Sequence, residues 1–299
     1  MNLPSEIIAL VFSQMKENPH SLMRMRLCCK RFEKLVDKNL KDWVTISDDD
    51  YIRLVRRGQS EVLEYLFGVR CIRDVRAQRN KALKYASGNG HDKVVALLLK
   101  YLTIGDVRSQ ENYVLRCASE KGHDKVVALL LKYLTINDVR SQENYALKWA
   151  SNNGHDKVVV LLLEHGLTLE DVRSQNNEAL RFASAEGHDK VVELLLKQGL
   201  TAEDVRSEEN EALRYASGNG RDKVVKILLE YLTINDVRSE ENEALRFASG
   251  NGHYKVVVLL LDYLTVEDVR SEDNEALRYA KENGRDKVVT LLEDFLGRS

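Results

Sequence analysis

The fold is decided by the stretch Asn177-Glu-Ala-Leu-Arg-Phe-Ala-Ser-Ala-Glu-Gly-His-Asp-Lys-Val-Val-Glu-Leu-Leu-Leu-Lys-Gln-Gly199. Close copies of it recur along most of the chain. The glycine before the second apolar run returns every 32 or 33 residues, at Gly58, Gly90, Gly122, Gly154, Gly187, Gly220, Gly252 and Gly284. A fixed period of this length predicts a stack of supersecondary units, each of which buries its apolar face against its neighbours.

Within each unit the apolar residues follow a helical period. We expect a first helix from about Asn177, as its N-cap, to Ala185, with Gly187 ending it as a C′ glycine. A second helix carries aliphatic residues at Val191, Val192, Leu194, Leu195 and Leu196. One unit buries too few side chains to offset the entropy of ordering its chain, so the units must stack.

This unit resembles the ankyrin repeat. Gly-His-x-x-Val-Val-x-Leu-Leu-Leu at Gly187–Leu196 is similar to that family's second-helix core, and the resemblance covers about residues 48–299. It implies an all-α solenoid of seven full repeats after one degenerate copy at Tyr51–Phe67. The glycine of the family's β-hairpin turn is replaced here by residues that do not favour a left-handed backbone. They are Arg79, Glu111, Glu143, Asn176, Glu209, Glu241 and Asp273.

The connectors instead read Thr-x-x-Asp-Val-Arg, a pattern similar to a helix capping box. We therefore predict a short helical turn rather than a β-hairpin in each connector. The threonines are Thr103, Thr135, Thr168, Thr201, Thr233 and Thr265. In the last copy, Lys281 and Glu293 place charge where another repeat would pack, as expected of a terminal repeat.

The first 45 or so residues do not follow the repeat. Leu3-Pro4-x-Glu6-Ile7-Ile8, Val11-Phe12-Ser13, Leu22, Cys28-Cys29-Lys30-Arg31-Phe32 and Trp43 together resemble an F-box. The resemblance implies docking on a Skp1-type adaptor that connects to a cullin. The implied adaptor-binding residues are Leu3, Pro4, Glu6, Ile7, Ile8, Val11, Phe12, Leu22, Leu27 and Phe32. The alternative is a helical cap for the array that is only similar to an F-box.

Composition narrows the function. A formal net charge of −2 argues against a nucleic-acid partner, and the apolar runs are too short to cross a bilayer. No signal peptide is expected, and the four cysteines form no C-x-x-C pair, which indicates reduced thiols in an intracellular, cytoplasmic protein.

No pattern points to catalysis, a cofactor or a metal. Histidines recur after the glycine, at His91, His123, His155, His188 and His253, but their spacing is that of the repeat, which favours packing at a helix start. The arginine column from Arg76 to Arg270 is interpreted as a solvated charge ladder with the aspartates two residues before each arginine.

We predict an adaptor-docking segment at residues 1–46 and an ankyrin array at 47–299. The predicted function is a substrate-recruiting subunit of a Skp1-cullin-F-box ubiquitin ligase, similar to proteins encoded by large DNA viruses. The alternative is a non-catalytic scaffold or decoy that sequesters a partner. The later repeats have glutamate in one column where two earlier copies have Tyr113 and Tyr145. We therefore predict that Tyr113, Tyr145 and Trp149 contact an unidentified target protein, although Trp149 also fits a core role with the tyrosines covering it.

Overall fold

The computed structural model describes residues 48–68, 72 and 74–297, and all regular secondary structure in these ranges is helical. The all-α prediction is confirmed. Contacts divide the chain into two units, one up to Val107 and one from Arg108.

In the first unit, helix pairs carry the degenerate copy and the first full repeat. Tyr51, Leu54 and Leu63 of the degenerate copy are buried, so its register matches the prediction. The Tyr51 hydroxyl donates to the carbonyl oxygen of Val75 at 3.4 Å. The helices are α3 (Asp48–Arg56), α4 (Ser60–Gly68), α5 (Ala77–Gly88), α6 (Asp92–Leu98) and α7 (Ile104–Val107).

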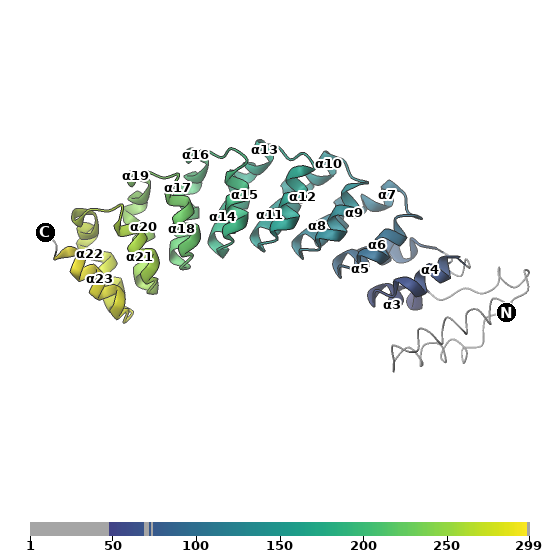
Figure 1. The fold of residues 1–299 in the computed structure, drawn as a ribbon, viewed down its shortest axis with the longest axis horizontal. Coiled ribbons are helices and arrows are strands. Elements are labelled where there is room, and N and C mark those ends of the chain that lie inside the picture. Colours follow the sequence, from purple (N-terminus) through teal and green to yellow (C-terminus); the bar gives the residue numbers. More distant parts are fainter. Residues whose placement is uncertain (1–47, 69–71, 73, 298–299) are drawn as a thin grey trace, which may run out of the picture. The chain divides into compact units, whose positions relative to one another are not determined.

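In the second unit, six helix pairs stack in chain order (Figure 1). The first helices of successive pairs pack on one another in one layer, and the second helices form another layer. The first helices are α8 (Ser109–Glu120), α11 (Ser141–Asn152), α14 (Ser174–Glu186), α17 (Ser207–Gly218), α20 (Ser239–Asn251) and α22 (Val266–Glu282). The second helices are α9 (Asp124–Leu131), α12 (Asp156–Glu164), α15 (Asp189–Leu196), α18 (Asp222–Leu229), α21 (Tyr254–Leu261) and α23 (Asp286–Leu296).

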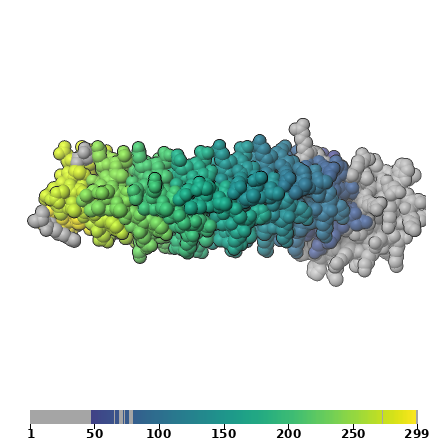
Figure 2. Space-filling model, turned by 90° about the horizontal axis from the view of Figure 1, so that it is seen from above, coloured from purple at the N-terminus to yellow at the C-terminus, as the bar shows by residue number. Residues whose placement is uncertain are grey.

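The predicted helical connectors are confirmed. Short helices lie at one edge of the stack. Figure 2 views the molecule from this edge and shows the repeats of the second unit arranged side by side in chain order. They are α10 (Ile136–Val139), α13 (Leu169–Val172), α16 (Ala202–Val205) and α19 (Ile234–Val237), while the last connector merges into α22. Each begins at a threonine that forms a capping box with the aspartate three residues on.

The expectation about the left-handed backbone is wrong. Before the helical part of α8, α11, α14, α17 and α20, three consecutive residues adopt positive φ. In α17 these are Glu208, Glu209 and Asn210, at 52°, 56° and 60°. This turn occupies the place of the β-hairpin turn that the resemblance to the ankyrin repeat implied. It also corrects the start of the first helix, because Asn177 lies inside this turn of α14 at φ 60° and is not an N-cap. Gly187 does end α14, with φ 85°.

The histidine column locks neighbouring repeats together. The ring of His188 lies against Gly154 of the preceding repeat and leaves no space there for a Cβ atom. Its Nε2 lies 2.9 Å from the carbonyl oxygen of Asn152, so an N–H at this position donates across the repeat boundary. His155 makes the same contact with Glu120 at 3.0 Å. These positions therefore serve packing at the helix start.

The last repeat compensates its two unusual charges internally. Lys281 of α22 and Glu293 of α23 form an ion pair of 2.7 Å, and both side chains are exposed. The charge that the sequence places in this repeat is thus paired within the same helix pair.

Candidate functional site

The predicted adaptor-binding residues all fall within residues 1–47, outside the described part of the chain. Those residues are Leu3, Pro4, Glu6, Ile7, Ile8, Val11, Phe12, Leu22, Leu27 and Phe32. The predicted target-binding residues lie on the exposed side of the first-helix layer, in α8 and α11.

The structure brings two of the three target-binding residues together. Tyr145 and Trp149 lie one turn apart on α11, with ring centroids 5.8 Å apart. Trp149 is half-buried, because its other side faces Phe182 of α14, 6.5 Å away. Trp149 therefore contributes to packing between repeats, and only part of it is available to a partner.

Tyr113 is the most open of the three, with 40% of its surface exposed. It lies one helical turn before Cys117, the residue that occupies the aromatic position of this repeat. Cys117 is smaller than the aromatic residues in the same column, which leaves α8 without a ring at this position. We name the set Tyr113, Cys117, Tyr145 and Trp149 the tyrosine cluster.

Tyr145 occupies a position that is part of an ion-pair ladder in later repeats. There a basic residue of one first helix meets a glutamate of the next, as Lys148 meets Glu178 at 3.1 Å. In the tyrosine cluster, Arg116 instead lies over the Tyr145 ring, 5.0 Å from its centroid. The ladder continues through Arg181–Glu211, Arg214–Glu243 and Arg246–Glu275.

The Tyr145 hydroxyl is held by a carboxylate. It donates to Glu120 of α8 at 3.1 Å. Burial and this hydrogen bond raise the pKa of Tyr145 above its ordinary value, so the side chain stays neutral. The cluster thus offers a partner aromatic side chains, one of which is held in a fixed orientation, and aromatic residues are often found at the centre of protein interfaces.

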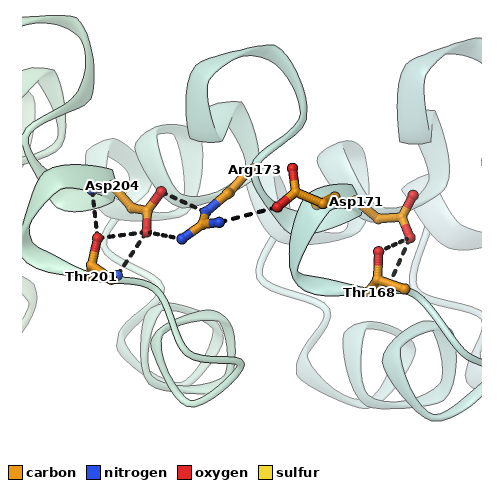
Figure 3. A network of polar contacts seen from close by, with 6 residues as sticks. Thr168, Asp171, Arg173, Thr201 and Asp204 are labelled. Atoms are coloured by element: carbon orange, nitrogen blue, oxygen red, sulfur yellow. Dashed lines mark hydrogen bonds and ion pairs between the residues drawn. The ribbon is translucent and has the colours of Figure 1, made fainter.

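A second network follows the connectors. Asp204 caps α16 by accepting from the backbone N–H and the hydroxyl of Thr201, at 2.7 and 2.9 Å. The same carboxylate accepts two hydrogen bonds from Arg173 of the preceding repeat, at 2.8 and 3.0 Å (Figure 3). The equivalent pairs are Arg76–Asp106, Arg108–Asp138, Arg140–Asp171, Arg206–Asp236 and Arg238–Asp268.

This network corrects the interpretation of the arginine column. Each arginine in these pairs bridges to the aspartate of the next repeat, about 30 residues on, and not to the one two residues before it. The aspartate side chains are nearly buried, so the ladder is not a solvated one. The physical reason is that adjacent connectors lie side by side, whereas residues two apart on one helix do not face each other.

The network lowers the pKa of several of its carboxyl groups. Burial alone would raise the pKa of Asp171, but hydrogen bonds from Arg140 and Thr168 outweigh burial and hold the pKa below its ordinary value. The same balance lowers the pKa of the carboxyl groups in the equivalent positions, Asp106, Asp138, Asp204 and Asp268.

One column of structural residues was missed from the sequence. The third left-handed position is asparagine, and in α8, α11 and α20 its amide donates to a carbonyl oxygen of the next connector. Asn112 donates to the carbonyl oxygen of Asp138 at 3.1 Å, and Asn242 donates to that of Asp268 at 3.1 Å. The signal was present, because an asparagine follows each connector aspartate by six residues.

Among the described residues, no group of histidine, cysteine and carboxylate side chains has the arrangement of a metal site. In the same part of the chain, no helix is long and apolar enough to cross a membrane.

Stacked helix pairs with an exposed first-helix layer define a helical-repeat solenoid. The family model for ankyrin repeats (three copies) matches residues 52–140, 115–205, 147–239 and 213–295, so the chain belongs to the ankyrin-repeat family. The F-box domain model matches residues 1–43. The chain therefore combines an F-box domain with ankyrin repeats, a combination that is typically non-catalytic. No curated protein matches the chain.

Proposed function

We propose that this protein is a substrate-recruiting subunit of a Skp1-cullin-F-box ubiquitin ligase. The observation that carries the proposal is the F-box match at residues 1–43, directly before ankyrin repeats that extend to residue 295. An F-box suggests binding to a Skp1-type adaptor, and ankyrin repeats mediate protein binding. In this proposal the chain performs no chemistry and only brings a target to the ligase.

The adaptor would bind the apolar side chains of the first 46 residues. Ile7, Ile8, Val11 and Phe12 recur at helical spacing, and so short a segment cannot bury them by itself. An apolar groove on a partner would cover such a stripe. The proposed contacts remain Leu3, Pro4, Glu6, Ile7, Ile8, Val11, Phe12, Leu22, Leu27 and Phe32.

Co-purification from cells tests this docking. The Leu3→Ala/Pro4→Ala variant of the full chain should lose the Skp1-type adaptor and the cullin, while its helical circular dichroism stays that of the wild type. A matched control is Ser299→Ala, at the opposite end of the chain. If the wild-type protein brings down neither subunit, the scaffold or decoy function replaces the ligase function.

The target would bind the tyrosine cluster. Tyr113 of α8 is exposed, and Tyr145 and Trp149 present a preformed aromatic edge on α11, the next first helix. We expect the Tyr113→Glu/Tyr145→Glu variant to weaken binding of an identified target at least tenfold, equivalent to about 1.4 kcal/mol. Unchanged affinity would place the target elsewhere on the first-helix layer.

The combination of an F-box with closely similar ankyrin units is also similar to that of proteins encoded by large DNA viruses. If this chain has such an origin, it would act in the host cytoplasm and redirect host ubiquitination. This part of the proposal rests on resemblance alone.

A further inference from the structure

The first helices near the C-terminal end of the array carry two exposed rings. Tyr215 of α17 is 46% exposed and Phe247 of α20 is 37% exposed. Phe247 packs closely against Gly218 of the preceding first helix. A Cβ atom added at Gly218 would lie only 3.3 Å from the Cβ atom of Phe247. A glycine at this position seats the ring on the preceding helix and leaves its other side open.

Carboxylates stand in the left-handed turns at the start of the same helices, six or seven residues before each ring. They are exposed, and among the described residues none of them belongs to an ion pair. They are Glu208, Glu209, Glu240 and Glu241. The ion pairs of the neighbouring arginines are with other carboxylates, since Arg214 pairs with Glu243 and Arg246 pairs with Glu275.

The tyrosine cluster does not have this charge. The two left-handed positions before the asparagine are Gln110-Glu111 in α8 and Gln142-Glu143 in α11, with one carboxylate each. In α17 and α20 they hold two carboxylates each. The surface of α17 and α20 thus pairs open aromatic rings with doubled negative charge, and it is separate from the cluster proposed above to bind the target.

The spacing of the rings selects a partner conformation. Packed helices lie about 8–10 Å apart, so rings on successive first helices repeat at about that distance. A polyproline II segment presents every third side chain on one face, at about 9.3 Å per turn. A β-strand returns to one face after about 6.7 Å, and an α-helix returns after about 5.4 Å per turn or about 10.5 Å over seven residues. None of these strand and helix spacings lies within about 8–10 Å.

We propose that α17 and α20 bind an extended, basic segment of another protein in the polyproline II conformation. Every third residue of this segment is apolar and packs beside Tyr215 and Phe247. Lysine or arginine at an intervening position faces the carboxylates, which precede each ring by six or seven residues. This interaction does not depend on adaptor docking or on the tyrosine cluster.

Fluorescence anisotropy with labelled peptides and the full chain tests this inference. The probe is a peptide of four Leu-Lys-Pro repeats. One control has the same composition with its four leucines at alternating positions of a central block, and another has glutamate in place of lysine. The probe should bind at least tenfold more tightly than either control, and added salt should weaken it because exposed charges are screened.

Variants locate the site. Tyr215→Ala/Phe247→Ala should weaken probe binding at least tenfold, and replacing the four glutamates by glutamine should weaken it at least fivefold. The control Tyr133→Ala/Tyr254→Ala removes two exposed rings associated with the second helices and should leave the affinity unchanged.

Three results would overturn the inference. Equal binding of the period-two peptide excludes the polyproline II fit. Unchanged affinity in both site variants excludes this surface. The site is excluded if the probe shows no saturable binding at peptide concentrations up to about 1 mM.

Discussion

The connector edge and the first-helix face are built from the same repeats but differ in how strictly they repeat. At the connector edge, the threonine, aspartate and arginine return in successive copies and bond to one another across each boundary. On the first-helix face, one column holds glutamate in late repeats and tyrosine at positions 113 and 145. Identical residues at every boundary stabilise the stack, whereas a binding surface must differ from place to place to select a partner. The first expectation is therefore that the edge controls stability and the face controls recognition.

The largest expected effect is acidification, because it acts on many connector aspartates at once. The pKa of Asp171 is lowered on folding, since hydrogen bonds from Arg140 and Thr168 outweigh burial, which alone would raise it. Such a group stabilises the fold above its unfolded pKa of about 3.9, and its contribution is lost as pH falls through the folded value. The urea midpoint should therefore drop steeply below about pH 4. The gap in stability between wild type and Asp171→Asn should narrow from pH 6 to pH 3; a constant gap would contradict this linkage.

A single substitution at the edge comes next. Asp204→Ala removes the cap of α16 and leaves Arg173 only its exposed pair with Glu170, so it should lower the free energy of unfolding by about 1–3 kcal/mol. Urea unfolding followed by circular dichroism measures the loss. The control is Glu203→Ala, an exposed neighbour on the same short helix. A loss no larger than that of the control would mean that the connector edge does not stabilise the stack.

The smallest stability effect concerns the left-handed turn. Glu209 has φ 56°, which costs a residue with a Cβ about 1 kcal/mol. Glu209→Gly should therefore raise the free energy of unfolding by about 0.5 kcal/mol after the extra entropy of the unfolded chain is deducted. Glu203→Gly, in the right-handed backbone of α16, should lower it by about 1 kcal/mol. Destabilisation by both changes would contradict the left-handed turn.

The sequence predicted the parts of the fold that depend on local chemistry. Apolar period, helix-ending glycine and the Thr-x-x-Asp pattern each act within a few residues, so the helices, Gly187 and the connector caps were predicted correctly. The Arg173–Asp204 pair was missed because it joins residues 31 apart, and only the stacking of repeats brings them together. The left-handed turn at Glu209 was missed because tertiary packing overrides a weak local preference.

The proposed site was predictable only in part. The exchange of glutamate for Tyr113 and Tyr145 identified an irregularity in the repeat. It did not show that Arg116 and Glu120 hold Tyr145, or that the Trp149 ring packs against Phe182 of the next repeat. Both arrangements depend on contacts between helices.

Quantitative affinity purification of three full-length proteins tests the central claim most directly. The claim is that adaptor docking and target capture use separate parts of one chain. The wild type should recover a Skp1-type adaptor, a cullin and a target. Leu3→Ala/Pro4→Ala should lose the adaptor and cullin but keep the target, whereas Tyr113→Glu/Tyr145→Glu should lose the target and keep the adaptor. Loss of adaptor and target together in either variant, or of neither in both, would contradict the account.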